Sequence, residues 1–169
     1  MAEVAFLSVN LDTFRAGDGE EFERVVIRHP GAVAIVPILD DQVVLVRQFR
    51  APIGTTLLEI PAGKLDVEGE PPELAAAREC EEETGYRPGR LEYLRTIHTA
   101  PGFTDEQIHL YLALDLVHVG SSPVGVEERH AEVLAMSFDE VQKGIAVGSI
   151  SDAKTLIGLH DALARHFRV

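Results

Sequence analysis

The stretch that decides the fold is RECEEETGY, residues 78–86, which places four glutamates within five positions and ends on a glycine and an aromatic residue. It closes a longer run of good helix formers that begins with two prolines. Proline is favoured at the first turn of a helix and glycine just past its end, so the pattern predicts a helix over 71–84 with Gly85 as its terminator.

The predicted helix gathers three of the glutamates on one face. At about 100° per residue, Glu79, Glu82 and Glu83 fall within an arc of roughly 100°, while Glu81 points to nearly the opposite side. Like charges at this spacing cost about 0.2–0.5 kcal/mol per pair. A Mg²⁺ ion would resolve the repulsion, because it prefers carboxylate oxygens and keeps waters that a substrate phosphate can replace. The simpler alternative is a solvated face with intrahelical ion pairs.

A second arc of the same helix is apolar. Leu74, Ala76, Ala77 and Cys80 are expected to pack on a sheet, and the small Ala75 is expected on the glutamate side.

Composition limits the possible functions. The 169 residues, 46% of them hydrophobic, suit one compact domain, and the formal charge of -13 argues against a nucleic-acid or membrane-surface partner. Cys80 is the only cysteine, which excludes an intrachain disulfide and favours a reducing compartment. The amino-terminal sequence lacks a basic segment followed by a long apolar core. These features predict a soluble, cytoplasmic protein.

The rest of the chain predicts a mixed α/β domain. Residues 31–39 and 42–50 are rich in β-branched side chains and flank Asp40 and Asp41, a hairpin pattern. Further strands are expected at 56–63, 90–99, 107–116 and 131–138, and two helices at the end of the chain, the first with a Ser137–Glu140 capping box. Residues 1–30 contain strand-like pieces and are expected to form a separate small antiparallel sheet before the main domain, residues 31–169.

The glutamate helix resembles the signature of the Nudix hydrolase family. That signature has an Arg-Glu pair, an apolar residue, a Glu-Glu pair and a glycine, with a glutamate eight residues before the arginine and a glycine further upstream. Here these positions are residues 78–86, Glu70 and Gly63. The chain departs from the family in having six residues instead of five between Gly63 and Glu70, which affects the loop and leaves the helix face intact. The resemblance implies a Nudix α/β/α sandwich with a mixed sheet.

Other segments resemble the ADP-ribose pyrophosphatase branch of the family. They are VRQFRAPIG, LLEIPAGK and APGFTDE, the last with Pro101 sixteen residues after Gly85. The resemblance implies hydrolysis of the pyrophosphate of ADP-ribose to AMP and ribose 5-phosphate, with Mg²⁺, or alternatively Mn²⁺ or Zn²⁺, as cofactor. It also implies a homodimer in which residues 1–30 reach the partner, with Arg24 or Arg28 contributing to the partner's site.

Roles follow residue by residue from the resemblance. The metal ligands are Glu79, Glu82, Glu83 and the main-chain carbonyl of Ala62, and Arg78 orients Glu82. Substrate contacts are assigned to two basic residues that meet the diphosphate, to a strand-end carboxylate and to loop residues: Arg47, Arg50, Glu59, Gly63, Pro101, Gly102, Phe103, Asp105, Glu106 and Arg28. The seven histidines show no ligand spacing, so we assign none of them a function.

The general base is expected on a loop outside the metal helix, because a carboxylate bound to a cation is a poor proton acceptor. In the family branch that this chain resembles, a glutamate on the loop between the last two strands has that role. The resemblance thus implies residues 123–133 here, which offer Glu127 and Glu128, of which we favour Glu127, with Glu132 as a third option. The alternative is that water activated by the metal needs no separate base.

Three other functions compete with ADP-ribose hydrolysis. One is hydrolysis of another nucleoside diphosphate sugar, such as a GDP-mannose type substrate, and another is a noncatalytic Nudix-like domain that binds nucleotides. The third is a calcium-binding acidic module, which is disfavoured because the carboxylates lie on a helix rather than on a loop with alternating oxygen ligands.

Overall fold

The computed structural model describes residues 2–4, 6–122, 125 and 128–166. Its strands are β1 (Ala2–Val4), β2 (Leu7–Arg15), β3 (Glu21–Arg28), β4 (Ala32–Leu39), β5 (Gln42–Arg50), β6 (Thr55–Glu59), β7 (Ala62–Lys64), β8 (Tyr86–Arg87), β9 (Arg90–His98), β10 (Gln107–Leu114), β11 (Val117–His118) and β12 (Glu132–Ser137). The helices are α1 (Pro72–Thr84), α2 (Phe138–Val147) and α3 (Ala153–His166), with short 3₁₀ turns at Ala51–Ile53 and Glu128–His130.

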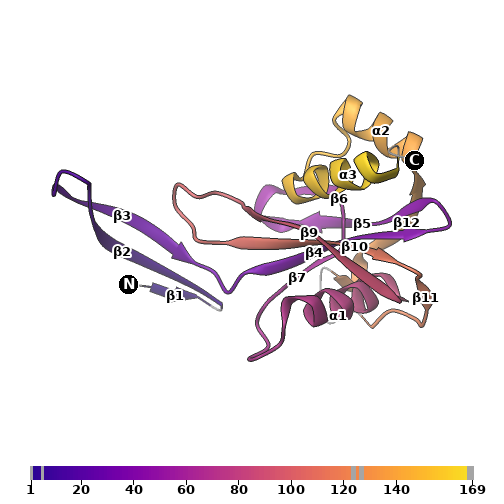
Figure 1. Ribbon diagram of the computed structural model, residues 1–169, viewed down its shortest axis with the longest axis horizontal. Coiled ribbons are helices and arrows are strands. Elements are labelled where there is room, and N and C mark those ends of the chain that lie inside the picture. Colours follow the sequence, from indigo (N-terminus) through magenta and orange to yellow (C-terminus); the bar gives the residue numbers. More distant parts are fainter. Residues whose placement is uncertain (1, 5, 123–124, 126–127, 167–169) are drawn as a thin grey trace.

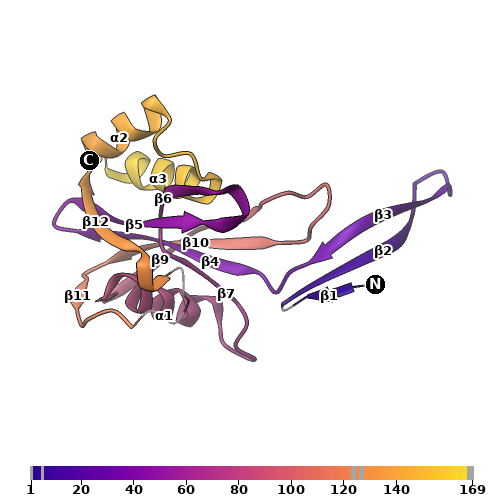
Figure 2. The same ribbon diagram turned by 180° about the vertical axis from the view of Figure 1, so that it is seen from behind.

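A mixed sheet lies between two helical layers (Figures 1 and 2). Its order is β12-β5-β4-β10-β9, with β6 also paired to β5 and β7 to β4. The β4–β10 pair is parallel and the other pairs are antiparallel. Helix α1 covers one face, and α2 and α3 cover the other. The predicted three-layer α/β architecture is confirmed.

The hairpin β4–β5 is short because its strands separate after the turn. Asp40 and Asp41 have φ of 46° and 62°, the left-handed conformation that a two-residue hairpin turn requires. Only two residue pairs join β4 to β5. Beyond them β6 pairs with β5 and β7 with β4, so the chain passes from one strand to the other. The single strand predicted over 56–63 is therefore two strands, broken at Ile60 and Pro61.

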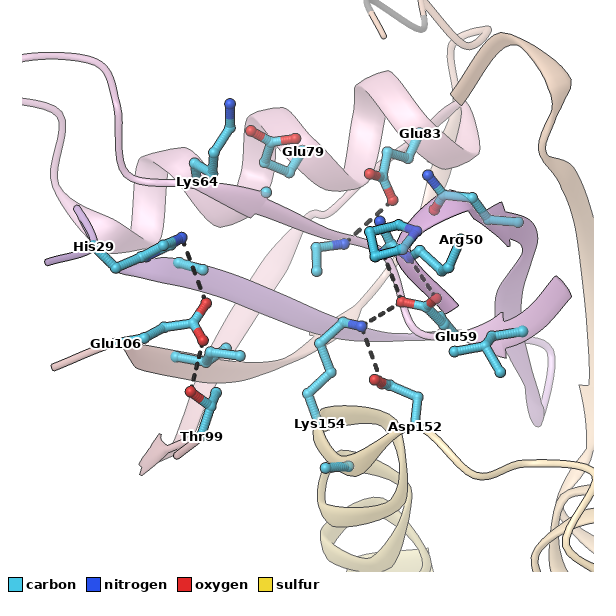
Figure 3. A pocket seen from close by; sticks show the side chains of 18 of the residues that line it. His29, Arg50, Glu59, Lys64, Glu79, Glu83, Thr99, Glu106, Asp152 and Lys154 are labelled. Atoms are coloured by element: carbon cyan, nitrogen blue, oxygen red, sulfur yellow. Dashed lines mark hydrogen bonds and ion pairs between the residues drawn. The ribbon is translucent and has the colours of Figure 1, made fainter. Parts of the chain in front are cut away.

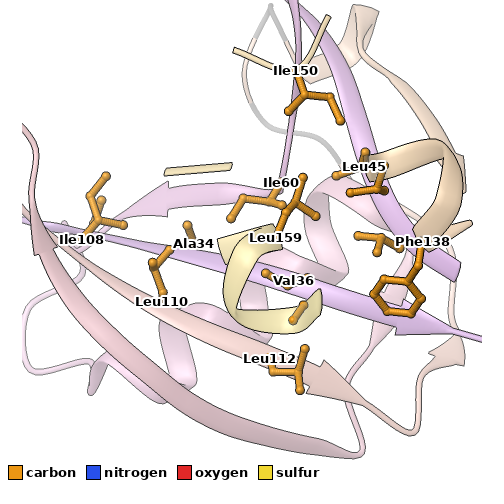
Figure 4. Packing of buried hydrophobic residues seen from close by; sticks show 14 residues of the cluster. Ala34, Val36, Leu45, Ile60, Ile108, Leu110, Leu112, Phe138, Ile150 and Leu159 are labelled. Carbon is orange, nitrogen blue, oxygen red and sulfur yellow. The ribbon is translucent and has the colours of Figure 1, made fainter. Parts of the chain in front are cut away.

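The alternating side chains of β4 supply both halves of the core. Ala34 and Val36 face α2 and α3, in a cluster with Leu45, Ile60, Leu110, Phe138 and Leu159 (Figure 4). Val33 and Ile35 face α1. Helix α3 approaches closely at Gly158, where a Cβ would lie 2.9 Å from Cγ2 of Val36.

Helix α1 begins and ends as predicted, but it packs through a different face. Pro71 is its N-cap, and Gly85 ends it in the left-handed conformation with φ of 78°. Ala75, Ala76 and Cys80 are fully buried, whereas Leu74 is 60% exposed. The expected packing of Leu74 on the sheet was wrong, because the helix turns its glutamate-bearing side, on which Ala75 was correctly placed, toward β7 and the sheet. Burial raises the pKa of the Cys80 thiol to about 12, as expected for a cysteine that acts as a small hydrophobe.

The amino-terminal segment forms a separate three-stranded antiparallel sheet, β1-β2-β3, as predicted. Its β2–β3 hairpin extends away from the rest of the molecule (Figure 1). Ile27, at the base of the hairpin, is joined to the loop before β10 by two hydrogen bonds. The Ile27 N–H donates to the Phe103 carbonyl, and the Asp105 N–H donates to the Ile27 carbonyl. In the part of the chain that the structure describes, no helix has the length and apolar character to cross a membrane.

Candidate active site

A cavity of about 900 Å³ lies where α1, the β5–β6 strands and the beginning of α3 meet (Figure 3). Glu79 and Glu83 of α1 form one wall with Ala62 and Gly63 of β7. The other walls carry charged side chains around Arg50 at one end and the side chains of His29, Thr99 and Glu106 at the other (Figure 3).

Gly63 fits closely under the glutamate face. A Cβ at this position would lie 1.8 Å from the carboxylate carbon of Glu79. Any side chain here would displace that carboxylate, so the glycine leaves the space that the Glu79 carboxylate occupies. One turn further along α1, Glu83 accepts a hydrogen bond from the Ala62 N–H at 3.2 Å. Strand β7 therefore hydrogen-bonds Glu83 and leaves space for Glu79.

Arg78 binds the carboxylates of three glutamates. Its guanidinium donates to both oxygens of Glu70, at 3.1 and 3.0 Å, to Glu79 at 2.7 Å and to Glu82 at 3.1 Å. The hydrogen bonds to Glu70 raise the pKa of Arg78 above its already high ordinary value, so Arg78 stays charged. The predicted contact with Glu82 is present, and the arginine also fixes the loop before α1 through Glu70.

The donor set suits a hard divalent cation. Glu79 and Glu83 present carboxylate oxygens to the cavity, next to the Ala62 main chain, and the close fit at Gly63 holds Glu79 against this wall. Among the described residues no three acidic, histidine or cysteine side chains stand close enough together to form a complete metal site. Arg78 already neutralises part of the charge on Glu79 and Glu82, and Glu82 does not line the cavity.

The charged end of the cavity is a chain of four groups. Arg50 donates two hydrogen bonds of 2.7 Å to the two oxygens of Glu59, whose side chain is 1% exposed. Lys154 bonds the same carboxylate and also Asp152, at 3.0 Å. Burial acts to raise the pKa of Glu59, but the Arg50 hydrogen bonds and the Lys154 charge outweigh it and lower that pKa. Glu59 is thus an ionised carboxylate that fixes Arg50 at the cavity.

At the other end, Glu106 accepts a hydrogen bond from Thr99 at 2.6 Å and lies 3.6 Å from the His29 ring nitrogen Nε2. Phe6 packs edge-to-face on His29, with ring centroids 5.3 Å apart. Of the loop residues predicted to contact substrate, Glu106 is the one that lines the cavity.

The remaining predicted contacts lie outside the cavity lining. Arg47 pairs with Glu132 at 2.6 Å on the surface. Arg28 donates to Asp105 at 3.0 Å, which holds the pKa of Asp105 below its usual value. Pro101 and Gly102, with Phe103, form an exposed turn that approaches the base of the amino-terminal sheet. Their substrate-binding roles stay predictions.

The predicted general bases cannot be placed relative to these walls. Glu127 lies outside the described residues. Glu128 begins a 3₁₀ turn, and its side chain is also outside the described part. Gly125 is the cavity-lining residue closest to them in the sequence.

Comparison with known proteins decides the family. Residues 28–155 match the family model of the NUDIX domain. The chain belongs to the Nudix family. The Nudix region includes every cavity-lining residue described above except Phe6.

Individual relatives agree with this assignment. A methanol dehydrogenase activator from Bacillus methanolicus is 38% identical over 154 residues, covering 90% of this chain and 83% of the relative. An ADP-ribose pyrophosphatase from Bacillus subtilis (strain 168) is 39% identical over 139 residues, covering 82% and 75%. A crystal structure of an ADP compounds hydrolase matches the fold with a TM-score of 0.85, at 24% identity, over 100% of this chain and 92% of that one. The predicted Nudix architecture is confirmed.

Several cavity residues were not found from the sequence. Lys154 and Asp152 lie about 70 residues beyond the Nudix helix, and Thr99 and His29 belong to no motif we recognised. The only available signal for Asp152 was its place three residues before Thr155, since it accepts hydrogen bonds from the Thr155 N–H at 3.0 Å and hydroxyl at 2.6 Å, as helix-capping aspartates do.

Proposed function

We propose that this Nudix protein hydrolyses the pyrophosphate of ADP-ribose to AMP and ribose 5-phosphate with Mg²⁺ as cofactor. The observation that carries the proposal is the cavity wall on which Glu79 and Glu83 face the same space as Arg50. Splitting a pyrophosphate requires neutralisation of charge on its oxygens and a positioned water, and carboxylates with a nearby guanidinium suit that task. The relative named ADP-ribose pyrophosphatase supports the choice of substrate.

The chain's own residues divide the work. Glu79, Glu83 and the Ala62 carbonyl would hold the cation, which neutralises phosphate charge and lowers the pKa of water. Arg50, oriented by Glu59, would donate to the diphosphate. Arg78 would keep Glu79 and Glu82 at fixed positions on α1. Mn²⁺ and Zn²⁺ are alternative ions for the same oxygen donors.

We place the general base on the loop before β12, at Glu127 or Glu128, where it would take the proton of the attacking water on a carboxylate oxygen. Glu127→Gln and Glu128→Gln, compared at saturating Mg²⁺, test this assignment. The variant that lacks the base should have a kcat about 10²–10⁴-fold lower, with little change in substrate affinity. Two near-normal rates would remove this loop from the mechanism.

The decisive experiment identifies products from a panel of nucleoside diphosphate derivatives. Purified protein with Mg²⁺ is expected to convert ADP-ribose to AMP and ribose 5-phosphate faster than it cleaves GDP-mannose. Faster GDP-mannose cleavage would support the alternative sugar-nucleotide substrate. Binding of these compounds without any cleavage would indicate a noncatalytic nucleotide-binding domain.

Glu83→Gln tests the metal assignment directly. The variant should keep the fold and lose turnover by orders of magnitude, because one anionic ligand becomes a neutral amide. Removing divalent ions with a chelator should abolish activity of the parent, and Mg²⁺ should restore it. Parent-like hydrolysis by Glu83→Gln would show that this residue is not a metal ligand. Glu81→Gln is the matched control, since Glu81 pairs with Arg87 on another side of α1.

We also propose a homodimer formed through residues 1–30. One face of the β2–β3 hairpin carries cross-strand apolar pairs, Val9 with Ile27 and Leu11 with Val25. Leu11 is 62% and Val25 53% exposed in the single chain. A projecting hairpin with such a face is suited to burial against a second copy. This proposal includes a domain boundary at residue 30. We also propose a cytoplasmic location, because a single cysteine suits a reducing compartment.

A further inference from the structure

A polar group at the end of the cavity away from Arg50 includes two residues, His29 and Thr99, that have been given no function so far. It consists of His29, between β3 and β4, Thr99 after β9, and Glu106 before β10. Figure 3 shows all three on one side of the cavity and Arg50, Glu59 and Lys154 on the other. The His29 side chain is 11% exposed and that of Glu106 25% exposed, so both are held within the protein yet open to the cavity.

The backbone fixes which nitrogen of His29 carries a proton. The Gly31 N–H donates a hydrogen bond of 3.0 Å to Nδ1. Nδ1 must therefore present a lone pair, which places the ring proton on Nε2. Phe6 packs against the ring and limits its rotation. His29 thus directs one N–H donor from Nε2 toward Glu106.

Glu106 is fixed in a complementary way. The Thr99 hydroxyl donates to its oxygen Oε2 at 2.6 Å, and Oε1 faces Nε2 of His29 at 3.6 Å. That distance is too long for a direct hydrogen bond. A hydroxyl group both donates and accepts. One hydroxyl can therefore accept from the His29 N–H and donate to Glu106 Oε1 at the same time.

We propose that His29 is a specificity-determining residue that, together with Glu106, binds a hydroxyl of the terminal sugar of a nucleoside diphosphate sugar. The proposal rests on the proposed function and names the end of the cavity that receives the sugar. The Arg50 guanidinium lines the cavity and suits the diphosphate, because a guanidinium can donate two parallel hydrogen bonds to phosphate oxygens. Apolar residues line both ends, with Pro52 and Ile53 next to Arg50 and Phe6 next to His29, so the sugar is assigned from the hydroxyl-binding pair of His29 and Glu106.

Two substitutions separate the structural and the binding role of His29. In His29→Asn, the amide oxygen can replace Nδ1 as acceptor for Gly31, but the side chain is too short to supply the donor at Nε2. In His29→Gln, the longer amide can supply a donor near Nε2 but no acceptor at Nδ1. A purely structural histidine predicts damage in the glutamine variant and a normal asparagine variant. The binding role predicts a specific defect in the asparagine variant.

The test measures binding of ADP-ribose and ADP by calorimetry in a chelator, so that no turnover occurs. Wild type should bind ADP-ribose more tightly than ADP, which lacks the terminal sugar. His29→Asn should lose about tenfold in ADP-ribose affinity, since it leaves a sugar hydroxyl and Glu106 incompletely paired, and should bind ADP as wild type does. His29→Gln should keep most of the preference for ADP-ribose, with a lower melting temperature.

Each other outcome has a definite meaning. Unchanged ADP-ribose affinity in His29→Asn, or equal losses for both ligands, would overturn the assignment, as would a wild type that binds neither ligand. If neither histidine variant folds, Thr99→Val decides, because it releases Glu106 alone and should weaken ADP-ribose but not ADP. A wild type that shows this binding pattern yet cleaves no nucleoside diphosphate sugar would refute the proposed function and leave the His29 inference standing.

Discussion

At the scale of single residues, the site depends on Gly63, which has no side chain. Gly63 leaves the space that the Glu79 carboxylate occupies, 1.8 Å from where a Cβ would stand. Gly63→Ala should therefore move Glu79 out of position and lower turnover by orders of magnitude, because a metal ligand must be held within a fraction of an ångström. Steady-state rates and Mg²⁺ dependence measure the effect.

Gly17→Ala is the control for this prediction. Gly17 lies in the turn between β2 and β3 and has open space where a Cβ would be added. It should retain parent activity. A Gly63→Ala protein with unchanged kcat and Mg²⁺ requirement would mean that Glu79 is dispensable for metal binding.

At the scale of elements, α2 depends on its N-cap residue, Ser137. Ser137 and Glu140 form the predicted capping box, with hydrogen bonds of 2.8 Å from the Ser137 N–H to Glu140 and 3.3 Å from the Glu140 N–H to the Ser137 hydroxyl. Ser137→Ala should destabilise the protein by about 1 kcal/mol, or roughly 2–4 °C in melting temperature for a chain of this size. Calorimetric unfolding measures it, with the exposed Ser151→Ala as control. An unchanged melting temperature would show that the cap adds nothing here.

The link between β6 and α3 predicts a pH dependence. The folded protein holds the pKa of Glu59 below its ordinary value of 4.5, despite burial, through Arg50 and Lys154. Its contribution to stability is therefore complete above about pH 4.5 and is lost as the pH falls toward the lowered value. The melting temperature of wild type should fall more steeply between pH 5 and 3 than that of Glu59→Gln.

Glu23→Gln, which removes the same charge from an exposed position on β3, controls for net charge. It should fall with pH as wild type does. If Glu59→Gln and wild type have parallel profiles, the ionised state of Glu59 does not contribute to folding in this range.

At the scale of the whole molecule, the projecting hairpin predicts self-association. Leu11→Asp places a charge in the centre of the exposed apolar face and should shift the protein from dimer to monomer in sedimentation velocity, by a factor of at least ten in the dissociation constant. Asn10→Asp adds the same charge to the opposite face of the hairpin and should leave the dimer intact. A monomeric wild type at micromolar concentration is incompatible with the prediction.

The sequence by itself determined the local structure and the chemical class of the site. Proline and glycine at the ends of α1, the β-branched run of β4 and the Ser137–Glu140 pair act within a few residues, so their outcomes can be read from the sequence. The glutamate spacing likewise fixed which carboxylates can share a helix face, and the family followed from that spacing together with Arg78, Glu70 and Gly63.

Only the tertiary structure decided which residues meet in the cavity. Glu59, at the end of β6, and Lys154, at the start of α3, are 95 positions apart and form an ion pair. His29, just before β4, lies next to Glu106, just before β10. No local pattern encodes these contacts, because the first depends on where β6 and α3 pack and the second on the parallel pairing of β4 with β10. The same packing turned Ala75 inward and Leu74 outward on α1, since helix rotation is set by the sheet that it covers and not by the arc of apolar residues alone.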